Sequence, residues 1–348
     1  MTPRRCTRGK VLLVGVWLGQ MVLLGMALAQ GAPKMHELRP APDTVHRGFF
    51  DASLKPVLTI DSGDIVRVWT ASGNPRYYEN LGVPKEKIPA ELYRVYEGVE
   101  DARRWDHTLR GPIFVNDAQP GDTLEIRIRS IDLWLPIAGQ GIAPNRGLLP
   151  EEFPYARDRG IWLDLETKTV EYLPGITLPL KPFWAVIGVA PPPGMGRVPS
   201  GPPNVFGGNM DNRDLGPGST LYLPVHVPGA LLSLGDGHAA QGYGEVCLSA
   251  IETSMQGEIQ VMLHKGKRIL WPRAETPTHY MTMGLHIDLD EAAKIATREM
   301  LDWLVEMKGL TREDAYMLAS LALDLVVTQV VDITKGIHAL MPKAIFRQ

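Results

Sequence analysis

The stretch "GPIFVNDAQPGDTLEIRIRSIDL", residues 111–133, decides what kind of fold this chain forms. It begins with a short apolar run, turns at Pro120-Gly121-Asp122, and continues with Leu124, Ile126 and Ile128 at every second position. Alternation with a period of two is typical of a β-strand that buries one face. The stretch therefore predicts two strands joined by a tight turn, in the manner of a hairpin.

A second stretch has the same layout. "KPVLTIDSGDIVRVWTAS", residues 55–72, places two apolar runs around Asp61-Ser62-Gly63-Asp64 and also predicts a hairpin. The shared pattern is open to two interpretations, an internal duplication or the same turn chemistry used twice. The chain also holds 35 Gly and 29 Pro, residues that weaken helix interiors, so the composition favours a β-rich fold.

The last sixty or so residues have a different character. A capping-box pattern at Asp288 precedes apolar residues at helical spacing and then Gly309, and Thr311 begins a second pattern of this kind. The predicted fold is α+β but mostly β, with sandwich- or barrel-like sheets and two amphipathic helices in the C-terminal part. We expect one catalytic unit over residues 45–348, with a β-rich region 45–270 and an α/β region 271–348.

Two segments are expected to be less regular. Residues 79–104 are polar and predict a short helix plus a loop. Residues 190–204, "APPPGMGRVPSGPPN", contain too much proline and glycine for regular structure, and we interpret them as a shaped loop over a site.

The N-terminus predicts export. A basic start precedes an uncharged apolar run, residues 11–29, which ends in a small-x-small cleavage pattern. We expect residues 1–29 to be a signal peptide and residues 30–44 to be an N-terminal arm of a periplasmic or extracellular protein. The alternative is an uncleaved membrane anchor formed by residues 11–29. Cleavage would remove Cys6 and leave only Cys247, so no intramolecular disulfide could form.

Charge and motifs exclude several classes of function. The full chain has a net charge of −3, and cleavage would remove four basic residues and no acid, which disfavours a nucleic-acid partner. No phosphate-binding loop, dinucleotide fingerprint or Gly-x-Ser-x-Gly elbow is present in the sequence. Because a divalent ion lowers the pKa of a bound water from 15.7 to about 7, a metal-activated water is the simplest remaining nucleophile.

One glycine-rich stretch holds the strongest candidate residues. "SLGDGHAAQGYGEV", residues 233–246, places Asp236 and His238 two apart, so that in a strand both side chains point to the same face. Glu245 can return to them if the glycines allow a tight turn. Asp, His and Glu together form a ligand set for Zn²⁺ or a similar ion, and their small neighbours are expected to leave room for a ligand.

A second glycine-rich stretch lies just upstream. "FGGNMDNRDLGPGS", residues 206–219, places Asn209 and Asp211 two apart after a glycine turn. Either stretch alone would be more typical of ordinary turns, but the two in succession predict a site. Cys247 could share that site, although cysteine is more often a buried structural residue.

These motifs resemble the acetamidase/formamidase family. The resemblance runs from about Val45 to about Phe346 and is most specific in "GGNMDNRDLGPGSTLYLPVHVPGALLSLGDGHAAQG". It implies a β-rich fold, oligomers, a divalent metal, and hydrolysis of short aliphatic amides to a carboxylate and ammonia. It also places the metal and substrate groups on Asp211, Asp236 and His238.

The resemblance adds His107, which matches the histidine before the family's Gly-Pro strand, and it has two departures. Members often have an acid at the position of Tyr243, and many have Thr-Gly-Pro in place of Arg110-Gly111-Pro112. Both departures are expected to lie near the site, so the amide can differ from formamide and acetamide.

The leading hypothesis is an exported amidase that forms homo-oligomers and binds a divalent metal, Zn²⁺ by preference and Ca²⁺ as the alternative. Asp211, Asp236 and His238 would hold the ion. Glu245 would act as general base, and His107 would stabilise the oxyanion. Gly208 and Asn209 would bind substrate. The alternative hypothesis is an exported small-molecule or sugar-binding protein with a degenerate site on the same fold.

Overall fold

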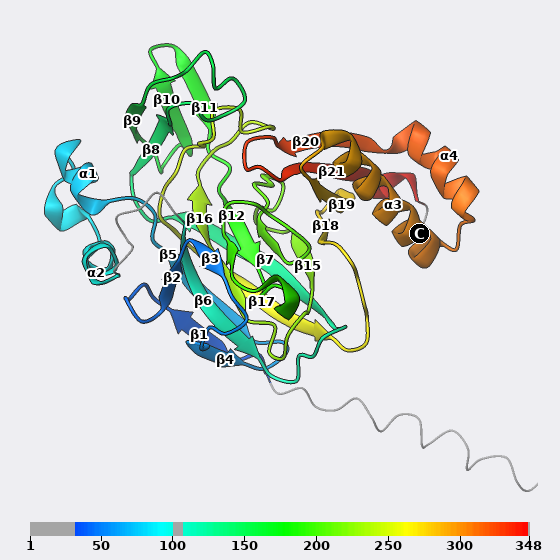
Figure 1. Ribbon diagram of the computed structural model, residues 1–348. Helices are drawn as coiled ribbons and strands as arrows, with labels where there is room; N and C mark the ends of the chain where they lie inside the picture. The colour runs from blue at the N-terminus through cyan, green and yellow to red at the C-terminus, as the bar shows by residue number, and fades with distance from the viewer. Residues whose placement is uncertain (1–31, 100–106, 347–348) are drawn as a thin grey trace, which may run out of the picture. The chain divides into compact units, whose positions relative to one another are not determined.

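The computed structural model describes residues 32–99 and 107–346, and its compact unit is Lys34–Gln348 (Figure 1). The predicted signal peptide, residues 1–29, lies outside the described residues. Among the helices that the structure describes, none is long and apolar enough to cross a membrane.

The unit is built mainly from strands, as predicted, and two sheets carry most of them. The nine-stranded sheet has the order β1 (Met35–Leu38), β5 (Ile65–Thr70), β17 (Met255–His264), β7 (Thr123–Leu133), β15 (Thr220–Pro224), β18 (Arg273–Glu275), β19 (His279–His286), β21 (Lys335–Pro342) and β20 (Asp324–Gln329). The six-stranded sheet has the order β14 (Gly207–Asn209), β12 (Phe183–Gly188), β16 (Leu232–His238), β6 (Thr108–Val115) and β2 (Val45–Arg47), with β4 (Leu58–Ile60) also paired to β6.

The two sheets share one hydrophobic core. The alternating residues Leu124, Ile126 and Ile128 of β7 are all buried, as predicted, and belong to the same cluster as Trp184 and Val186 of β12. Burial of apolar area contributes roughly 25 cal/mol per Å², so this shared interior is the main stabilising contact between the sheets. It supports β16, the strand that carries Asp236 and His238.

The prediction of two hairpins is wrong. β6 and β7 flank the turn at Pro120-Gly121-Asp122, but β6 lies in the six-stranded sheet and β7 in the nine-stranded sheet. β4 and β5 are divided between the sheets in the same way. Each turn therefore carries the chain from one sheet to the other. Alternation identifies strands, but strand pairing depends on distant segments: β5 and β7 both pair with β17.

The two turns are built alike. Asp64 Oδ2 accepts the Asp61 N–H at 3.0 Å, and Asp122 Oδ2 accepts the Gln119 N–H at 2.8 Å. The glycine before each aspartate has a positive φ, as the third position of a type II turn requires. The repeated sequence pattern thus encodes two equivalent crossings between the sheets.

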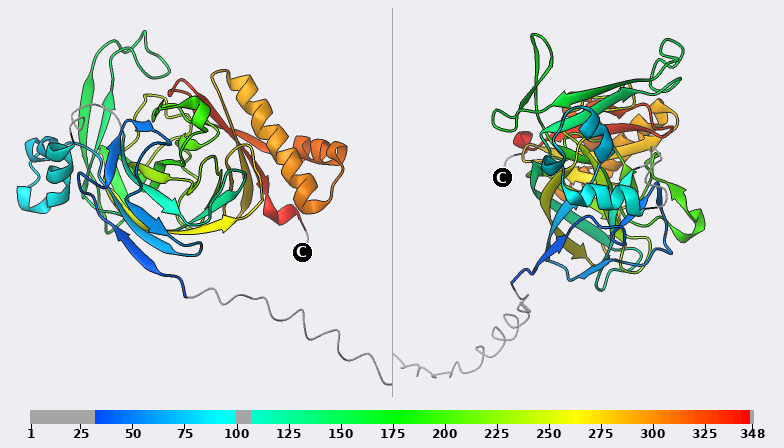
Figure 2. Two further views of the ribbon diagram at one scale, coloured as in Figure 1. Left: turned by 60° about the horizontal axis from the view of Figure 1, so that its bottom comes forward. Right: turned by 90° about the vertical axis from the view of Figure 1, so that its left-hand side faces the viewer.

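Four α-helices complete the described unit: α1 (Pro75–Asn80), α2 (Ala90–Gly98), α3 (Leu289–Lys308) and α4 (Arg312–Ala322). The two predicted C-terminal helices are confirmed as α3 and α4. Asp288 accepts the N–H groups of Asp290 and Glu291 at the start of α3, and Gly309 ends this helix with φ 64°. Ala292 and Ala296 of α3 pack against β21, and Figure 2 shows the two helices beside that strand.

The remaining described strands form three two-stranded sheets. β3 (Phe49–Phe50) pairs with β13 (Val198–Pro199), β8 (Ile137–Ile142) pairs with β9 (Arg157–Trp162), and β10 (Thr169–Leu173) pairs with β11 (Ile176–Pro179). Short 3₁₀ turns lie at Lys85–Lys87, Pro193–Met195 and Lys343–Ile345.

Two segments differ in detail from their predictions. Part of the predicted N-terminal arm forms β1, an edge strand parallel to β5, because its backbone continues the nine-stranded sheet. Residues 190–204 are largely irregular, as expected, apart from one 3₁₀ turn and β13. Ser200 in this segment bonds His107, so the loop does reach a predicted site residue. Residues 100–106 of the predicted helix-plus-loop segment lie outside the described residues.

Candidate active site

The end of β16 brings Asp236 and His238 together, as their spacing predicted. His238 Nε2 lies 3.3 Å from Asp236 Oδ2, and the ring is 1% exposed. The glycines of this strand were predicted to leave room for a ligand, but in the structure they allow close packing of the backbone. A Cβ at Gly237 would lie 2.5 Å from the Thr253 carbonyl oxygen, so glycine here allows two backbones to approach and does not leave room for a ligand.

The predicted turn after β16 also forms and returns Glu245 to the histidine. Glu245 Oε1 lies 4.0 Å from His238 Nδ1, and the Glu245 N–H bonds the Gly242 carbonyl. The neighbouring Gly244 is anchored on both sides, because its N–H bonds Thr328 O and its carbonyl accepts the Val330 N–H. The loop is therefore fixed by the segment around β20.

Three acids of the site have left-handed backbone conformations. The φ angles are 50° at Asp211, 54° at Asp236 and 48° at Glu245. Such values cost energy for residues with a Cβ and persist where the surrounding structure requires them, most often at functional sites. Their coincidence at three side chains around one imidazole supports a functional role.

The side chains form two overlapping donor groups that share His238. In one group, atoms of Asp211, His238 and Glu245 lie within 4.8 Å of one another, and in the other the same holds for Asp236, His238 and Glu252. Glu252 Oε2 is 3.0 Å from His238 Nε2. The three predicted ligands Asp211, Asp236 and His238 are thus divided between the groups, and their joint role as ligands stays a prediction.

Gln241 fixes the orientation of the shared imidazole. Its Oε1 lies 2.8 Å from His238 Nδ1, while its Nε2 donates to the Asp211 carbonyl at 2.9 Å. Because the amide nitrogen is used at Asp211, the oxygen faces the ring and accepts an Nδ1–H. Nε2 then faces Asp236 and Glu252, where it donates an N–H while the ring is charged and can bind a metal once that proton is lost, an arrangement typical of metal-binding histidines.

The site holds more negative than positive charge. Burial lowers the pKa of His238, but the charges of Glu252 and Asp236 more than offset it and hold this pKa well above its ordinary value. Burial raises the pKa of Glu245 well above its ordinary range, and it also raises the pKa of Glu252. Burial raises the pKa of Asp236 too, but the charges of His238 and His107 bring it below its usual value.

Asp332 adds a fifth carboxyl group to the site, next to Asp211. Burial raises the pKa of Asp211 strongly, and the charges of Glu245 and Asp332 raise it further. The Oδ2 atoms of Asp211 and Asp332 are both buried, and no donor among the described residues bonds either of them. These two groups can bond each other only by sharing a proton. A bound cation would relieve the crowding, so the donor set fits a divalent metal.

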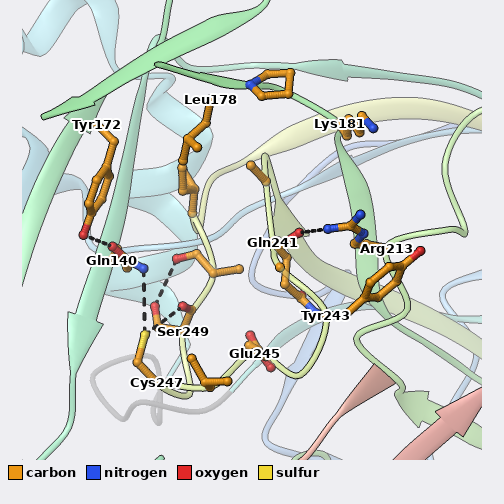
Figure 3. Close-up of a pocket in the computed structure, with 16 residues that line it drawn as sticks. Gln140, Tyr172, Leu178, Lys181, Arg213, Gln241, Tyr243, Glu245, Cys247 and Ser249 are labelled. Atoms are coloured by element: carbon orange, nitrogen blue, oxygen red, sulfur yellow. Dashed lines mark hydrogen bonds between the residues drawn. The ribbon is translucent and has the colours of Figure 1, made fainter. Parts of the chain in front are cut away.

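A cavity of about 500 Å³ opens beside this cluster (Figure 3). Glu245 and Gln241 border it directly and link it to His238. The opposite wall comes from the small hairpins, with Tyr172 of β10 and Leu178 of β11. Its size is in the range of ligand-binding pockets, which is roughly 300–1,000 Å³.

The remaining predicted site residues lie around the cluster. His107 Nε2 is 3.6 Å from Asp236 Oδ2, and its Nδ1 bonds Ser200 Oγ at 3.0 Å. Gly208 and Asn209 are buried on β14 and do not border the cavity, although Asn209 Oδ1 has no hydrogen-bond partner among the described residues. The catalytic role of His107 and the substrate-binding roles of Gly208 and Asn209 stay predictions.

The neighbouring residues have different surroundings. Arg110 does not border the cavity, and its buried guanidinium donates to the Trp69 and Thr44 carbonyls. Cys247 is half-buried and borders the cavity, so it is not the fully buried structural residue expected from its type. Tyr243 does border the cavity, as expected.

The sequence interpretation missed Glu252 and Asp332. Glu252 lies in "VCLSAIET", directly after the glycine-rich stretch, and a bridge to His238 brings it back to the site. Its position shortly after the most specific motif was the available signal. Asp332 lies between β20 and β21 and has no local motif, so only the tertiary fold reveals its contact with Asp211.

A buried carboxylate–imidazole cluster beside a cavity, on a mostly β unit, has the features of a hydrolase site. The comparisons agree with that class. A family model described as the acetamidase/formamidase family matches residues 194–348. A solved acetamidase from Bacillus halodurans is 32% identical, with a TM-score of 0.75, over 89% of this chain and 98% of that protein. The chain belongs to the acetamidase/formamidase family.

Other relatives support the same family. A solved acetamidase from Yersinia enterocolitica is 31% identical, with a TM-score of 0.78, over 92% of this chain and 95% of that protein. A protein of Schizosaccharomyces pombe named as a formamidase is 28% identical in an alignment that covers 47% of this chain. This match spans only 54% of that curated relative. The family's named members are amidases, and this chain is an enzyme of that class.

Proposed function

We propose that this protein hydrolyses the amide of a short carboxylic acid to a carboxylate and ammonia. The proposal rests on the buried His238, which is shared by two pairs of carboxylates, Asp211 with Glu245 and Asp236 with Glu252. Of these acids, Glu245 borders the cavity. In the reaction the water oxygen bonds the carbonyl carbon, the C–N bond breaks, and a proton passes to the departing nitrogen.

The residues that would hold a divalent ion are Asp236, His238 and Glu252. This set replaces Asp211 by Glu252 because Nε2 of His238 faces Glu252 and Asp236. An imidazole nitrogen among the ligands favours Zn²⁺ over Ca²⁺, which takes oxygen ligands. When bound, the ion supplies a water of lowered pKa and polarises the amide carbonyl.

The other residues handle protons and position the substrate. Glu245 is the carboxyl group of the cluster that reaches the cavity, so it is placed to take a proton from the attacking water and give it to the leaving ammonia. Gln241 holds the His238 ring in one orientation. His107 lies beside Asp236 and is our candidate for stabilising the oxyanion.

The test combines metal analysis with ammonia release from a panel of primary amides. We expect one divalent ion per chain and turnover that falls at least about a hundredfold in Glu252→Gln and His238→Ala. The matched control is Glu258→Gln, which removes a carboxylate of the partly exposed ion pair with Arg67. Normal turnover by His238→Ala would contradict the proposal, and tight ligand binding without any product would favour the alternative of a binding protein.

We also propose that the protein is exported and forms homo-oligomers. Support for export comes from the sequence of residues 1–29 alone. The protein purified from the native host should begin near Gln30, and retention of residues 11–29 would favour the membrane anchor instead. N-terminal sequencing distinguishes these outcomes.

A further inference from the structure

The cavity beside Glu245 is much larger than a simple amide needs. A molecule as small as acetamide occupies on the order of 100 Å³, a few times the ~30 Å³ that one water takes in the liquid. The cavity measures about 500 Å³. Most of its walls are apolar, including Leu178 and Ile251. An occupant that fills it therefore has a hydrocarbon body as well as an amide group.

The charges on the cavity wall are uneven. Lys181 and Arg213 both border the cavity, and Glu245 is the only acid that does so among the described residues. Figure 3 shows Lys181 and Arg213 on the same side of the cavity, across from Tyr172 and Leu178. This separates a cationic wall from an apolar wall.

The two cations differ in how they are engaged. Arg213 donates one N–H to the Gln241 carbonyl, and its guanidinium lies 3.8 Å from the centre of the Tyr243 ring. Tyr243 in turn donates to Asp214, so Arg213 is held in place by its neighbours. The Lys181 ammonium has no hydrogen bond or ion pair with any residue in the described ranges. It is a cation on a cavity wall with no partner from the protein.

We propose, on the basis of the proposed amidase function, that the substrate is an amide whose acyl chain ends in a carboxylate, that is, the monoamide of a dicarboxylic acid. The amide group lies at Glu245, the methylene chain lies along the apolar wall, and the carboxylate meets Lys181 and Arg213. Charge-assisted hydrogen bonds of this kind are stronger than neutral ones, so Lys181 and Arg213 determine specificity. Tyr243 contributes by holding the Arg213 guanidinium.

The kinetic test compares isosteric substrates. The monoamides of succinic, glutaric and adipic acid are assayed against the corresponding diamides, which have the same shape and no charge. We expect kcat/KM to be at least about tenfold higher for the best monoamide than for its diamide. Lys181→Met should remove most of this preference through KM and leave kcat/KM for the diamide within about twofold. The control, Lys55→Met, replaces an exposed lysine outside the cavity lining and should change neither value.

A binding experiment separates this inference from the proposed function. Calorimetric titration with glutarate needs no turnover, and we expect its affinity to fall about tenfold in Lys181→Met and to stay unchanged in Lys55→Met. Glutarate should also slow alkylation of Cys247, which borders the cavity, as measured on its peptide by mass spectrometry. Binding of this kind without hydrolysis of any amide would contradict the proposed function and leave the pocket assignment standing. Equal kcat/KM for monoamide and diamide, or equal loss of both in Lys181→Met, would overturn the inference.

Discussion

At the scale of single residues, the orientation of His238 depends on Gln241. The amide accepts the Nδ1–H and is itself fixed by its bond to the Asp211 carbonyl. Side chains that orient a metal-binding histidine typically change metal affinity by 10–100-fold when removed. The contribution of Gln241 should therefore appear in metal binding even before activity is measured.

We predict that Gln241→Leu weakens Zn²⁺ binding by about 10–100-fold, measured by competition with a chromogenic chelator. The control is Gln260→Leu on β17, whose amide donates to the Gly63 carbonyl at a distant turn. Unchanged affinity in Gln241→Leu would show that the His238 ring is held by other contacts.

A second residue links stability to pH. Burial lowers the pKa of His46 to about 4, and the charge of Arg110 acts in the same direction against a backbone hydrogen bond at Phe49. The unfolded chain binds this proton near pH 6.5, whereas the folded protein does so only near pH 4. Its stabilising contribution is therefore complete above pH 6.5 and is lost as the pH falls toward 4.

We predict that His46→Gln flattens the dependence of unfolding free energy on pH between 6.5 and 4, by up to about 3 kcal/mol. Glutamine can keep a hydrogen bond to Ser233 Oγ, which His46 Nε2 makes at 2.9 Å. Urea unfolding of the wild type and the variant at both pH values checks this. Parallel pH profiles would mean that His46 does not titrate differently in the folded and unfolded states.

At the scale of secondary-structure elements, β16 positions the site because its backbone is enclosed on both sides. A Cβ at Gly235 would lie 2.5 Å from the Thr108 carbonyl oxygen, and one at Gly237 would lie 2.5 Å from the Thr253 carbonyl oxygen. These are contacts with backbone atoms, which cannot rotate away. Neither Gly235 nor Gly237 can be replaced by a larger residue without moving the neighbouring strands.

We predict that Gly237→Ala destabilises the protein by about 1–3 kcal/mol and displaces His238, with loss of metal affinity. Gly242→Ala is the matched control, because nothing lies within 4 Å of its added Cβ. Chemical unfolding and metal titration of the two variants give the comparison. A Gly237→Ala protein with wild-type stability would contradict the close packing of β16.

Several elements could be predicted from sequence because their determinants are local. The caps at Asp288 and Gly309 fix both ends of α3. The spacing of Asp236 and His238 was enough to place both side chains together. Strand pairing was not predictable in the same way, because the turn at Asp122 has the same local chemistry whether the next strand stays in the sheet or crosses to another.

At the scale of the whole molecule, the site is assembled from distant parts of the chain. Asp211 follows β14, Asp236 and His238 end β16, and Asp332 lies between β20 and β21. The acids in the two glycine-rich stretches, Asp211, Asp236 and Glu245, could be predicted from the sequence. Asp332 could not be predicted, because the contact with Asp211 depends on how the C-terminal region folds back over the loop at Gly244.

The molecule also exposes apolar side chains that support the predicted homo-oligomer. On α4, Tyr316, Met317 and Leu321 are exposed, and Leu321 retains 86% of its accessible surface. We predict that light scattering coupled to size exclusion gives a mass of more than one chain at micromolar concentration. Leu321→Glu should shift this distribution toward the monomer, since a buried charge opposes association. A wild-type protein that runs as a monomer of 38.4 kDa or less would contradict the prediction.

The most direct test of the central claim is anomalous diffraction from crystals grown with Zn²⁺, collected on either side of the zinc absorption edge. We predict one strong peak per chain at about 2.0–2.2 Å from His238 Nε2, with carboxylate oxygens of Asp236 and Glu252 at similar distances. A peak at another place in the chain, or a fully zinc-loaded, active enzyme with no peak near His238, would contradict it.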